Sequence, residues 1–386
     1  MSIKRWSKAF GGMVAIMCMA ALTAAPAAMC ADTWKIGGIF SVTGPASFLG
    51  DPEKRSMEML AEQINEEGGI DGKKVEVVIY DTEGDSTKAV LSAQKLVNKD
   101  NVLAIVGPSR TPTTLAVVPI VEKARVPQIS CAAGNKITQP VKPYVFKTAQ
   151  SDIHAVAAIY TQMKEKGLAK IAVMTVANGF GESGREQLLA QAGDYGLEVV
   201  ADESFGGKDT DMMAQLAKIR GTDAEAIVCW GTNPGPAVVA KNARQLKIDM
   251  PLYMSHGVAS PKFIELAGDA AEGIMLPTGK ILVADLLPDS DPQKAVLQKY
   301  IRDYEQTTGQ SVSGFGGYAY DGLMILKKTL PGTGGDRAKL RDNIEAIDEY
   351  VGVSGVFDFS AKDHNGLSSE AFVMVRIRNG AWELMK

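Results

Sequence analysis

Residues 74–106, KVEVVIYDTEGDSTKAVLSAQKLVNKDNVLAIV, contain the pattern that decides the fold. An apolar run at 74–81 predicts a strand, and 86–98 has the apolar spacing of a helix that Thr87 or Asp85 can cap. A second apolar run at 103–106 has the length of a short buried strand. Parallel strands need a crossover connection, which is usually a helix, so this stretch predicts a β-α-β unit of a parallel sheet.

The same alternation of strands and helices extends in both directions from this unit. On its N-terminal side, 35–40 predicts a strand and 53–66 a helix. On its C-terminal side, we expect a helix at 113–123 and a strand at 128–130. This order packs as a parallel sheet with helices on both faces.

A second unit of the same design begins near Ser151. Its expected helices are 153–166, 182–195, 211–220 and 236–246, and its expected strands are 170–176, 197–201, 226–230 and 252–255. Two more helices are expected at 291–307 and 317–330, and the tail at 355–385 is expected to form strands joined by a turn at 363–366.

The fold class that follows is α/β, with two doubly wound parallel-sheet lobes joined by a hinge of several chain crossings. A chain of 386 residues is long enough for about two domains. We predict that the first lobe comprises residues 32–150 and 279–360. The second lobe is predicted to comprise 151–278 and 361–386.

The N-terminal segment differs from the rest of the chain. Three basic residues within the first eight positions precede an apolar run at 10–22 and small residues at 24–28. This order is that of a secretory signal peptide, and the apolar run is shorter than the roughly 20 residues of a membrane span. We expect residues 1–31 to be removed by cleavage near Ala31 and the protein to be periplasmic. A lipid anchor at Cys30 is the alternative.

The charge and the cysteine content limit the partners. The chain has 41 Lys and Arg and 45 Asp and Glu, and loss of the three N-terminal basic residues leaves 38 against 45, a net charge of −7. Nucleic-acid binding needs basic surface, so we expect no nucleic-acid partner. The remaining cysteines, Cys131 and Cys229, are expected to stay unpaired because they lie at the ends of different strands.

The sequence contains few constellations that carry catalysis. Its three histidines, His154, His256 and His364, have no metal-ligand spacing, and there is no G-x-S-x-G elbow. We therefore expect that the protein is not an enzyme and that it binds no metal ion and no cofactor. We expect His154 and His364 to lie on the surface, whereas His256 follows a strand and can face a ligand.

One glycine pattern favours a different class of protein. The glycines at 179, 181 and 184 match G-x-G-x-x-G, and Asp202 ends the next expected strand, which together approach a dinucleotide fingerprint. Phe180 would crowd a pyrophosphate on this loop, and it can instead face a ligand cleft. An exported dinucleotide-binding enzyme remains an alternative.

Ligand binding is expected beyond the carboxyl ends of the strands, where helix N-termini attract anions. At the end of the 103–106 strand, Thr111 is expected to cap a helix and Pro112 to occupy its first position. A carboxylate can accept hydrogen bonds from the Thr111 hydroxyl, and Arg110 can add a bidentate contact. After the 226–230 strand, Asn233 is expected to cap the next helix. The predicted ligand-binding residues are Leu49, Ser109, Arg110, Thr111, Ala132, Gly134, Phe180, Trp230, Thr232 and His256.

The chain resembles a known family in several segments. Residues 34–51, with IGGIFSVTGP at 36–45, resemble the mature start of the Leu/Ile/Val-binding proteins of ABC transporters. The segments 105–119, 126–130 and 264–273 resemble the same family in the same order. The resemblance implies a monomeric, two-lobed periplasmic receptor with a three-stranded hinge, which closes over a small ligand and docks on a membrane permease. A ligand-sensing receptor subunit of the same fold is the alternative.

The resemblance also implies roles for single residues. Thr111 matches a hydroxyl that holds the ligand carboxylate, and Ala132 matches a backbone carbonyl contact. Gly134 lies where amino-acid binders have threonine, and His256 lies where they have an acidic residue, both of which contact the α-ammonium. Phe180, the turn 230–233 and Leu49 match wall positions of the site.

The two departures affect the expected ligand. An ammonium buried without a counter-charge is costly, so the sequence favours a carboxylate that lacks an α-ammonium, such as an aromatic or short organic acid. An amino acid whose ammonium is held by another acidic residue is the alternative.

Overall fold

The computed structural model describes residues 33–385. The expected signal peptide and the alternative anchor at Cys30 lie outside these residues. Within 33–385, no helix combines the length and the apolar character needed to span a bilayer.

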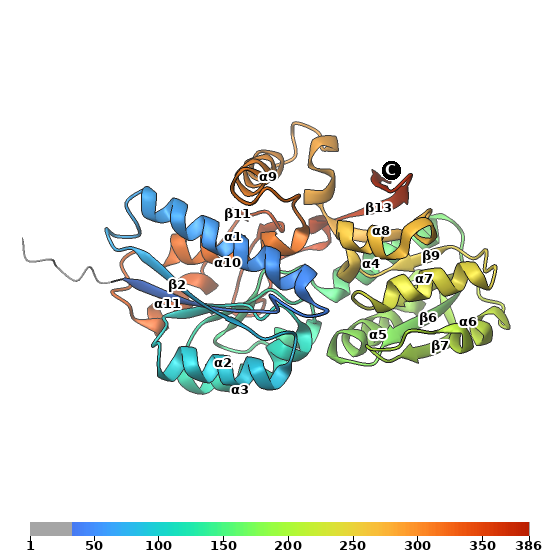
Figure 1. The fold of residues 1–386 in the computed structure, drawn as a ribbon, viewed down its shortest axis with the longest axis horizontal. Helices are drawn as coiled ribbons and strands as arrows, with labels where there is room; N and C mark the ends of the chain where they lie inside the picture. Colours follow the sequence, from blue (N-terminus) through green and yellow to red (C-terminus); the bar gives the residue numbers. More distant parts are fainter. Residues whose placement is uncertain (1–32, 386) are drawn as a thin grey trace, which may run out of the picture. The chain divides into compact units, whose positions relative to one another are not determined.

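The first sheet has five parallel strands in the order β2-β1-β3-β4-β5. Their bounds are β1 Trp34–Phe40, β2 Val75–Asp81, β3 Ala104–Val106, β4 Gln128–Ser130 and β5 Val145–Lys147. Helices from between and after these strands are α1 Ser47–Glu66, α2 Ser86–Asn98, α3 Thr111–Ala124, α9 Lys294–Thr308, α10 Gly314–Thr329 and α11 Arg337–Glu345. Figure 1 shows α1 and α10 on one face of this sheet and α2 and α3 on the other. Each face has its own buried apolar cluster.

The second sheet has seven strands in the order β14-β13-β10-β9-β8-β6-β7. Their bounds are β6 Lys170–Val176, β7 Glu198–Phe205, β8 Ala226–Trp230, β9 Leu252–Met254, β10 Met275–Gly279, β13 Phe372–Arg378 and β14 Ala381–Leu384. The pairs from β7 to β10 are parallel, whereas β13 and β14 pair antiparallel at one edge.

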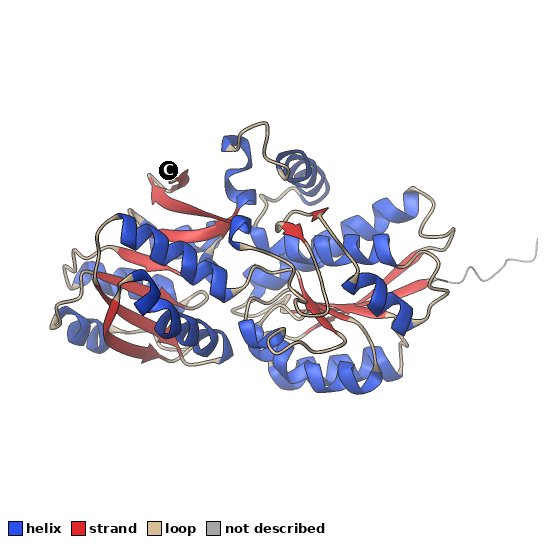
Figure 2. Ribbon diagram, turned by 180° about the vertical axis from the view of Figure 1, so that it is seen from behind, coloured by secondary structure: helices blue, strands red, loops and turns tan. Residues whose placement is uncertain are grey.

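Helices cover both faces of the second sheet too. Their bounds are α4 Asp152–Glu165, α5 Gly179–Gln191, α6 Met213–Arg220, α7 Gly235–Gln245 and α8 Pro261–Ala267. Helices α4 and α5 pack together over one apolar cluster, and α6, α7 and α8 cover another. Figure 2 shows the helices arranged around the strands of each sheet. Two doubly wound α/β sheets therefore form the protein, as the alternating pattern predicts.

The remaining elements are short. The strands β11 Tyr350–Val351 and β12 Val356–Phe357 pair antiparallel with each other. Short 3-10 helices occupy Asn135–Ile137, Ala192–Tyr195, His256–Val258, Gly268–Ala271, Lys280–Leu286 and Ser369–Ala371.

Within residues 33–385, the chain passes between the two sheets at three places: between β5 and α4, after β10, and before β13. Side chains tie these crossings together. Gln150 donates from Nε2 to the Ser354 carbonyl oxygen at 2.7 Å, and Asn365 donates from Nδ2 to the Ala149 carbonyl oxygen at 3.0 Å. We call the two sheets with their helices the first and second lobes; the residue limits given above for the lobes remain a prediction.

Several sequence-based limits differ from the structure. Helix α1 begins at Ser47 and not at residue 53, because Pro52 lies inside the helix and does not interrupt it. The tail strands β13 and β14 are joined by Asn379 and Gly380, both at positive φ, and not by the turn at 363–366.

Candidate ligand-binding site

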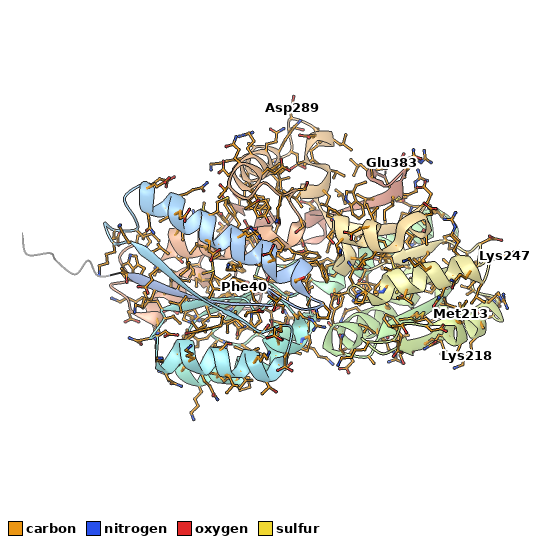
Figure 3. All side chains as sticks on the ribbon, viewed as in Figure 1. Phe40, Met213, Lys218, Lys247, Asp289 and Glu383 are labelled. Atoms are coloured by element: carbon orange, nitrogen blue, oxygen red, sulfur yellow. The ribbon has the colours of Figure 1, made fainter. Side chains whose placement is uncertain are left out.

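A cavity lies where the carboxyl ends of strands from both sheets are followed by loops and helices. It encloses about 450 Å³, part of which is open to solvent, and we call it the interlobe cavity. Its lining residues are Leu49, Ser109, Arg110, Thr111, Pro112, Cys131, Ala132, Ala133, Phe180, Thr232, His256, Gly257, Phe315 and Tyr318. The structure therefore brings together eight of the ten predicted residues, all except Gly134 and Trp230. Figure 3 shows all the side chains on the ribbon.

Thr111 contributes its side chain from the first turn of α3. The expectation that it caps this helix is wrong, because Arg110 occupies the N-cap position in an extended conformation and Thr111 is the first helical residue. The Thr111 hydroxyl instead accepts a hydrogen bond from the Gly134 backbone N–H at 3.2 Å. A hydroxyl has one proton to donate besides its lone pairs, so the Thr111 proton stays available to the cavity.

Gly134 lies behind Thr111 and does not line the cavity. A Cβ atom at this position would lie 2.3 Å from Thr111 Cγ2. Glycine is therefore required for the close approach of this loop to α3. A threonine here, which the resemblance implies for amino-acid binders, would displace Thr111.

Arg110 brings a positive charge to the cavity. Its Nη1 donates to the Gly84 carbonyl oxygen at 3.0 Å, which fixes part of the guanidinium group. Burial lowers the pKa of Arg110 from its usual value. Among residues 33–385, no acidic side chain forms an ion pair with Arg110, so its charge is not neutralised within this part of the protein.

His256 is a buried polar residue that lines the cavity from the second lobe. It is 4% exposed, and its ring packs edge-on against Phe180, Trp230 and Phe372 at centroid distances of 5.7, 5.7 and 5.4 Å. Burial, together with a smaller contribution from the positive charge of Lys147, lowers the pKa of His256 to about 3. The imidazole is therefore neutral at physiological pH.

The hydrogen-bonding capacity of His256 is unused by the described residues. Neither ring nitrogen has a hydrogen-bond partner among them. Nε2 lies 3.7 Å from Asp152 Oδ1, which is too long for a hydrogen bond. A neutral imidazole has one donor and one acceptor, so His256 can offer either to a ligand.

A buried cation lies close to the part of the cavity that His256 lines. Lys147, fully buried at the end of β5, donates from Nζ to the Ala133 carbonyl oxygen at 2.8 Å and to the Ser151 hydroxyl at 3.0 Å. Burial lowers the pKa of Lys147 to about 8, and burial raises the pKa of nearby Asp152 to about 6. The sequence does not single out Lys147, because a lysine is normally assigned to the exposed surface.

Trp230 supports the cavity from behind. Its side chain is fully buried, and its ring lies 5.9 Å from Phe180 and 5.7 Å from His256, measured between centroids. Thr232, two residues later, is the part of this turn that lines the cavity. The expectation that Asn233 caps α7 is wrong, because Pro234 holds the N-cap position without a side-chain cap.

The glycine-rich turn after β6 is explained by close packing. A Cβ on Gly181 would lie 1.7 Å from the Val176 carbonyl oxygen, and a Cβ on Gly184 would lie 2.1 Å from Trp230 Nε1. Asp202, which the fingerprint would assign to a ribose, forms an ion pair with Arg185. These residues have structural partners, so the pattern gives no support to the dinucleotide alternative.

Six lining residues escaped the sequence analysis as site residues. Phe315 and Tyr318 come from the first turns of α10, whose glycine- and aromatic-rich start, GFGGYAYDG at 314–322, is the signal that was available. Tyr318 donates from its hydroxyl to Gln150 Oε1 at 2.7 Å, so the cavity wall is bonded to a chain crossing. The other four are Pro112, Cys131, Ala133 and Gly257.

The cysteines and the remaining histidines do not form a reactive centre. Cys131 and Cys229 are both free and buried, as expected. His364 is fully buried and not on the surface; its ring stacks on Phe146, and Nε2 lies 2.9 Å from Glu345 Oε2. His154 is partly buried. Between residues 33 and 385, no cluster of three or more His, Cys, Asp or Glu side chains is placed to hold a metal ion.

Comparisons with known proteins agree on one family. The model of the periplasmic binding protein family matches residues 33–381. A leucine-, isoleucine-, valine-, threonine- and alanine-binding protein of Pseudomonas aeruginosa is 28% identical over 325 residues, which cover 82% of this chain and 83% of that protein. Leu/Ile/Val-binding protein homolog 7 of Brucella abortus is 25% identical over 378 residues, or 91% of each chain.

Solved structures show the same similarity. An extracellular ligand-binding receptor from Rhodopseudomonas palustris HaA2 has a TM-score of 0.86 and 26% identity, covering 92% of this chain and 100% of that one. A branched-chain amino acid transporter substrate binding protein from Streptococcus pneumoniae, solved with isoleucine, has a TM-score of 0.81, 28% identity and the same coverage.

The resemblance and the α/β fold class predicted from the sequence are thereby confirmed. The matched relatives are solute-binding proteins and not enzymes, in agreement with the expectation that this chain catalyses no reaction. The chain belongs to the periplasmic binding protein family, and it is a solute-binding protein similar to the Leu/Ile/Val-binding proteins of ABC transporters.

Proposed function

We propose that this protein is the exported receptor of an ABC transporter, and that it captures a small carboxylate without an α-ammonium and delivers it to the membrane permease. Aromatic and short organic acids are the ligand classes. The observation that carries the proposal is the charge of the interlobe cavity. Arg110 lines it, whereas no aspartate or glutamate is among its lining residues.

The carboxylate is held from the first lobe. The Thr111 hydroxyl has a proton to donate, and the N-terminus of the 14-residue helix α3 adds a partial positive charge. Arg110 adds a full charge that no described acidic residue neutralises. These groups favour an anion over a neutral or zwitterionic ligand.

The body of the ligand lies against apolar and aromatic side chains. Leu49 and Phe315 line the cavity from the first lobe, and Phe180 lines it from the second. His256, neutral and without a partner, supplies the polar contact opposite the carboxylate. Residues of both lobes contact one ligand, so binding favours the closed arrangement by its differential affinity for that state.

An amino acid ligand is the competing possibility, and the names of the relatives support it. Its α-ammonium would need an acidic partner. Asp152 is the nearest acid to His256, but it does not line the cavity, and burial raises its pKa to about 6. A buried ammonium facing a neutral imidazole is costly.

Calorimetric titration separates the two ligand classes. Benzoate and a short organic acid are expected to bind, and leucine is expected to bind far more weakly. Benzyl alcohol, which has the ring of benzoate without its carboxylate, is the matched control and is expected not to bind. Tight leucine binding by the unmodified protein would defeat the organic-acid assignment.

Transport is tested separately from binding. Deletion of the gene is expected to abolish high-affinity uptake of the bound acid, because the permease receives its solute from the receptor. Unchanged uptake together with a lost behavioural or transcriptional response would instead identify a sensing subunit of the same fold.

A further inference from the structure

Glu53 is a buried residue of α1, and its carboxyl group is hydrogen-bonded to a residue that lines the interlobe cavity. Its side chain is fully buried and bonds through Oε2 to the hydroxyl of Ser109, which lines the cavity. Glu53 Oε1 has no hydrogen-bond partner among the described residues. The proposed function makes no use of this acid.

The surroundings of Glu53 favour its neutral form. The titratable groups that face it are Cys131 after β4 and Tyr318 on α10. The negative charge of Asp321, also on α10, raises the pKa of both of these groups. None of them is a cation. Burial raises the pKa of Glu53 well above its usual value, and the Ser109 hydrogen bond offsets only part of this effect.

The protonation of Glu53 decides what Ser109 can offer a ligand. A serine hydroxyl has one proton and two lone pairs. One lone pair of Ser109 accepts the Ser41 backbone N–H at 3.0 Å. If Glu53 is ionised, the Ser109 proton points to Glu53, and only a lone pair is left to face the cavity.

The neutral acid reverses this arrangement. A protonated Glu53 donates to the second lone pair of Ser109, which frees the Ser109 proton for the cavity. An ionised Glu53 would also repel a carboxylate at a distance where low dielectric strengthens the interaction. Both effects act in the same direction.

We propose that Glu53 is a positioning residue: as the neutral acid it turns the Ser109 hydroxyl toward the interlobe cavity, so that an anionic ligand binds the form of the protein in which Glu53 is protonated. This inference rests on the proposed function, since it assumes a carboxylate in this cavity. It adds a proton linkage that the proposed function does not contain. Affinity falls as pH rises through the pKa of Glu53, by at most tenfold per pH unit because one proton is linked.

The first experiment observes the proton directly. Infrared difference spectra of wild type and E53Q, recorded at about pH 7 with benzoate as the probe, are expected to show the carbonyl band of a protonated acid only in wild type. Asp321 is also buried, and burial raises its pKa to about 6, so D321N is the matched control that separates its band from that of Glu53. A benzoate complex without a Glu53 acid band would overturn the proposal.

The second experiment measures benzoate affinity from about pH 6 to about pH 9. Lys147 and Asp152 also titrate in this window, so wild type is compared with E53Q, in which the amide keeps the neutral donor at all pH values. Wild type is expected to lose up to tenfold in affinity per pH unit relative to E53Q once the pH passes the pKa of Glu53. Identical profiles over a pH range in which the infrared band of the Glu53 acid disappears would contradict the linkage.

S109A completes the test. It is expected to weaken benzoate binding by about tenfold or more, the range for a lost hydrogen bond to a charged group, and to reduce the pH dependence due to Glu53 to the part that arises from direct repulsion between ionised Glu53 and benzoate. An S109A profile as steep as that of wild type would show that Ser109 does not carry the effect. If benzoate does not bind at all, the proposed ligand class is wrong. The infrared spectrum of the free protein then still shows whether Glu53 is protonated. An ionised Glu53 at about pH 6 would overturn the inference.

Discussion

At the scale of single residues, the first lobe holds its polar groups on rigid supports. Thr111 is 2% exposed and is oriented by the Gly134 N–H. Thr111→Ala is expected to weaken carboxylate binding by about ten- to a hundredfold, because a hydrogen bond to a charged group is lost. Calorimetry measures the change. Thr113→Ala, which removes a hydroxyl bonded to the Arg110 carbonyl oxygen on the same helix, is the control, and equal losses in the two variants would remove Thr111 from the site.

His256 makes a prediction about stability and pH. Its pKa is about 3 in the folded protein and close to 6.5 in an unfolded chain. Between these values the unfolded chain binds a proton that the folded protein does not, so stability is lost as pH falls from about 6.5 towards 3. His256→Gln removes this loss, which amounts to at most about 1.4 kcal/mol per pH unit.

Urea unfolding of wild type and His256→Gln at several pH values measures the effect. Asp321, whose pKa burial raises to about 6, is present in both proteins and cancels in the comparison. Both proteins are also compared in an Asp152→Asn background, because Asp152 Oδ1 lies 3.7 Å from His256 Nε2. Stability curves that stay parallel from neutral pH down to about pH 4 would show that His256 is protonated in the folded state.

At the scale of elements, helix α5 approaches β8 closely because Gly184 has no side chain. A Cβ there would lie 2.1 Å from Trp230 Nε1. Gly184→Ala is expected to destabilise the protein by about 1–3 kcal/mol through overpacking and to weaken ligand binding, because Trp230 supports Phe180 and His256. Gly193→Ala, where a Cβ meets nothing within 4 Å, is the control. Equal unfolding midpoints for the two variants would contradict the packing argument.

Elements with a clear apolar pattern were predictable, and elements without one were not. The limits of α2, β4, β6 and β8 agree with the sequence, because each has a clear apolar pattern and a turn or cap beside it. The strand β5 and the helix α11 were missed, since β5 ends in a charged lysine and α11 buries only two of its nine residues.

The residues of the site also divide into those that the sequence predicts and those that it does not. Residues next to strand ends, such as Ser109, Thr232 and His256, were predictable because parallel strands end at one edge of a sheet. Phe315 and Tyr318 were not, since they belong to α10, far along the chain, and reach the cavity only through the packing of α10 against α1. Glu53 and Lys147 were missed because charged residues in an amphipathic pattern are normally assigned to the exposed face.

At the scale of the whole molecule, the interlobe cavity is connected to the chain crossings. Tyr318 in its wall bonds to Gln150 on the crossing between β5 and α4, and Gln150 bonds in turn to the carbonyl oxygen of Ser354 in the turn between β11 and β12. A ligand that contacts both lobes therefore acts on the same hydrogen bonds that join them. Side chains of both lobes line the cavity, so separation of the lobes is expected to widen the path by which a ligand enters.

The position of Cys131 makes the separation of the lobes measurable as the rate of a chemical labelling reaction. Cys131 lines the cavity and is 3% exposed, whereas Cys229 is 0% exposed and does not line the cavity. In a Cys229→Ser background, a small thiol reagent is expected to label Cys131 only during separation of the lobes, and saturation with benzoate should slow labelling severalfold. Labelling at the same rate with and without benzoate would contradict this. The chain thus contains a native reporter whose reaction rate registers how often the receptor stands empty and open.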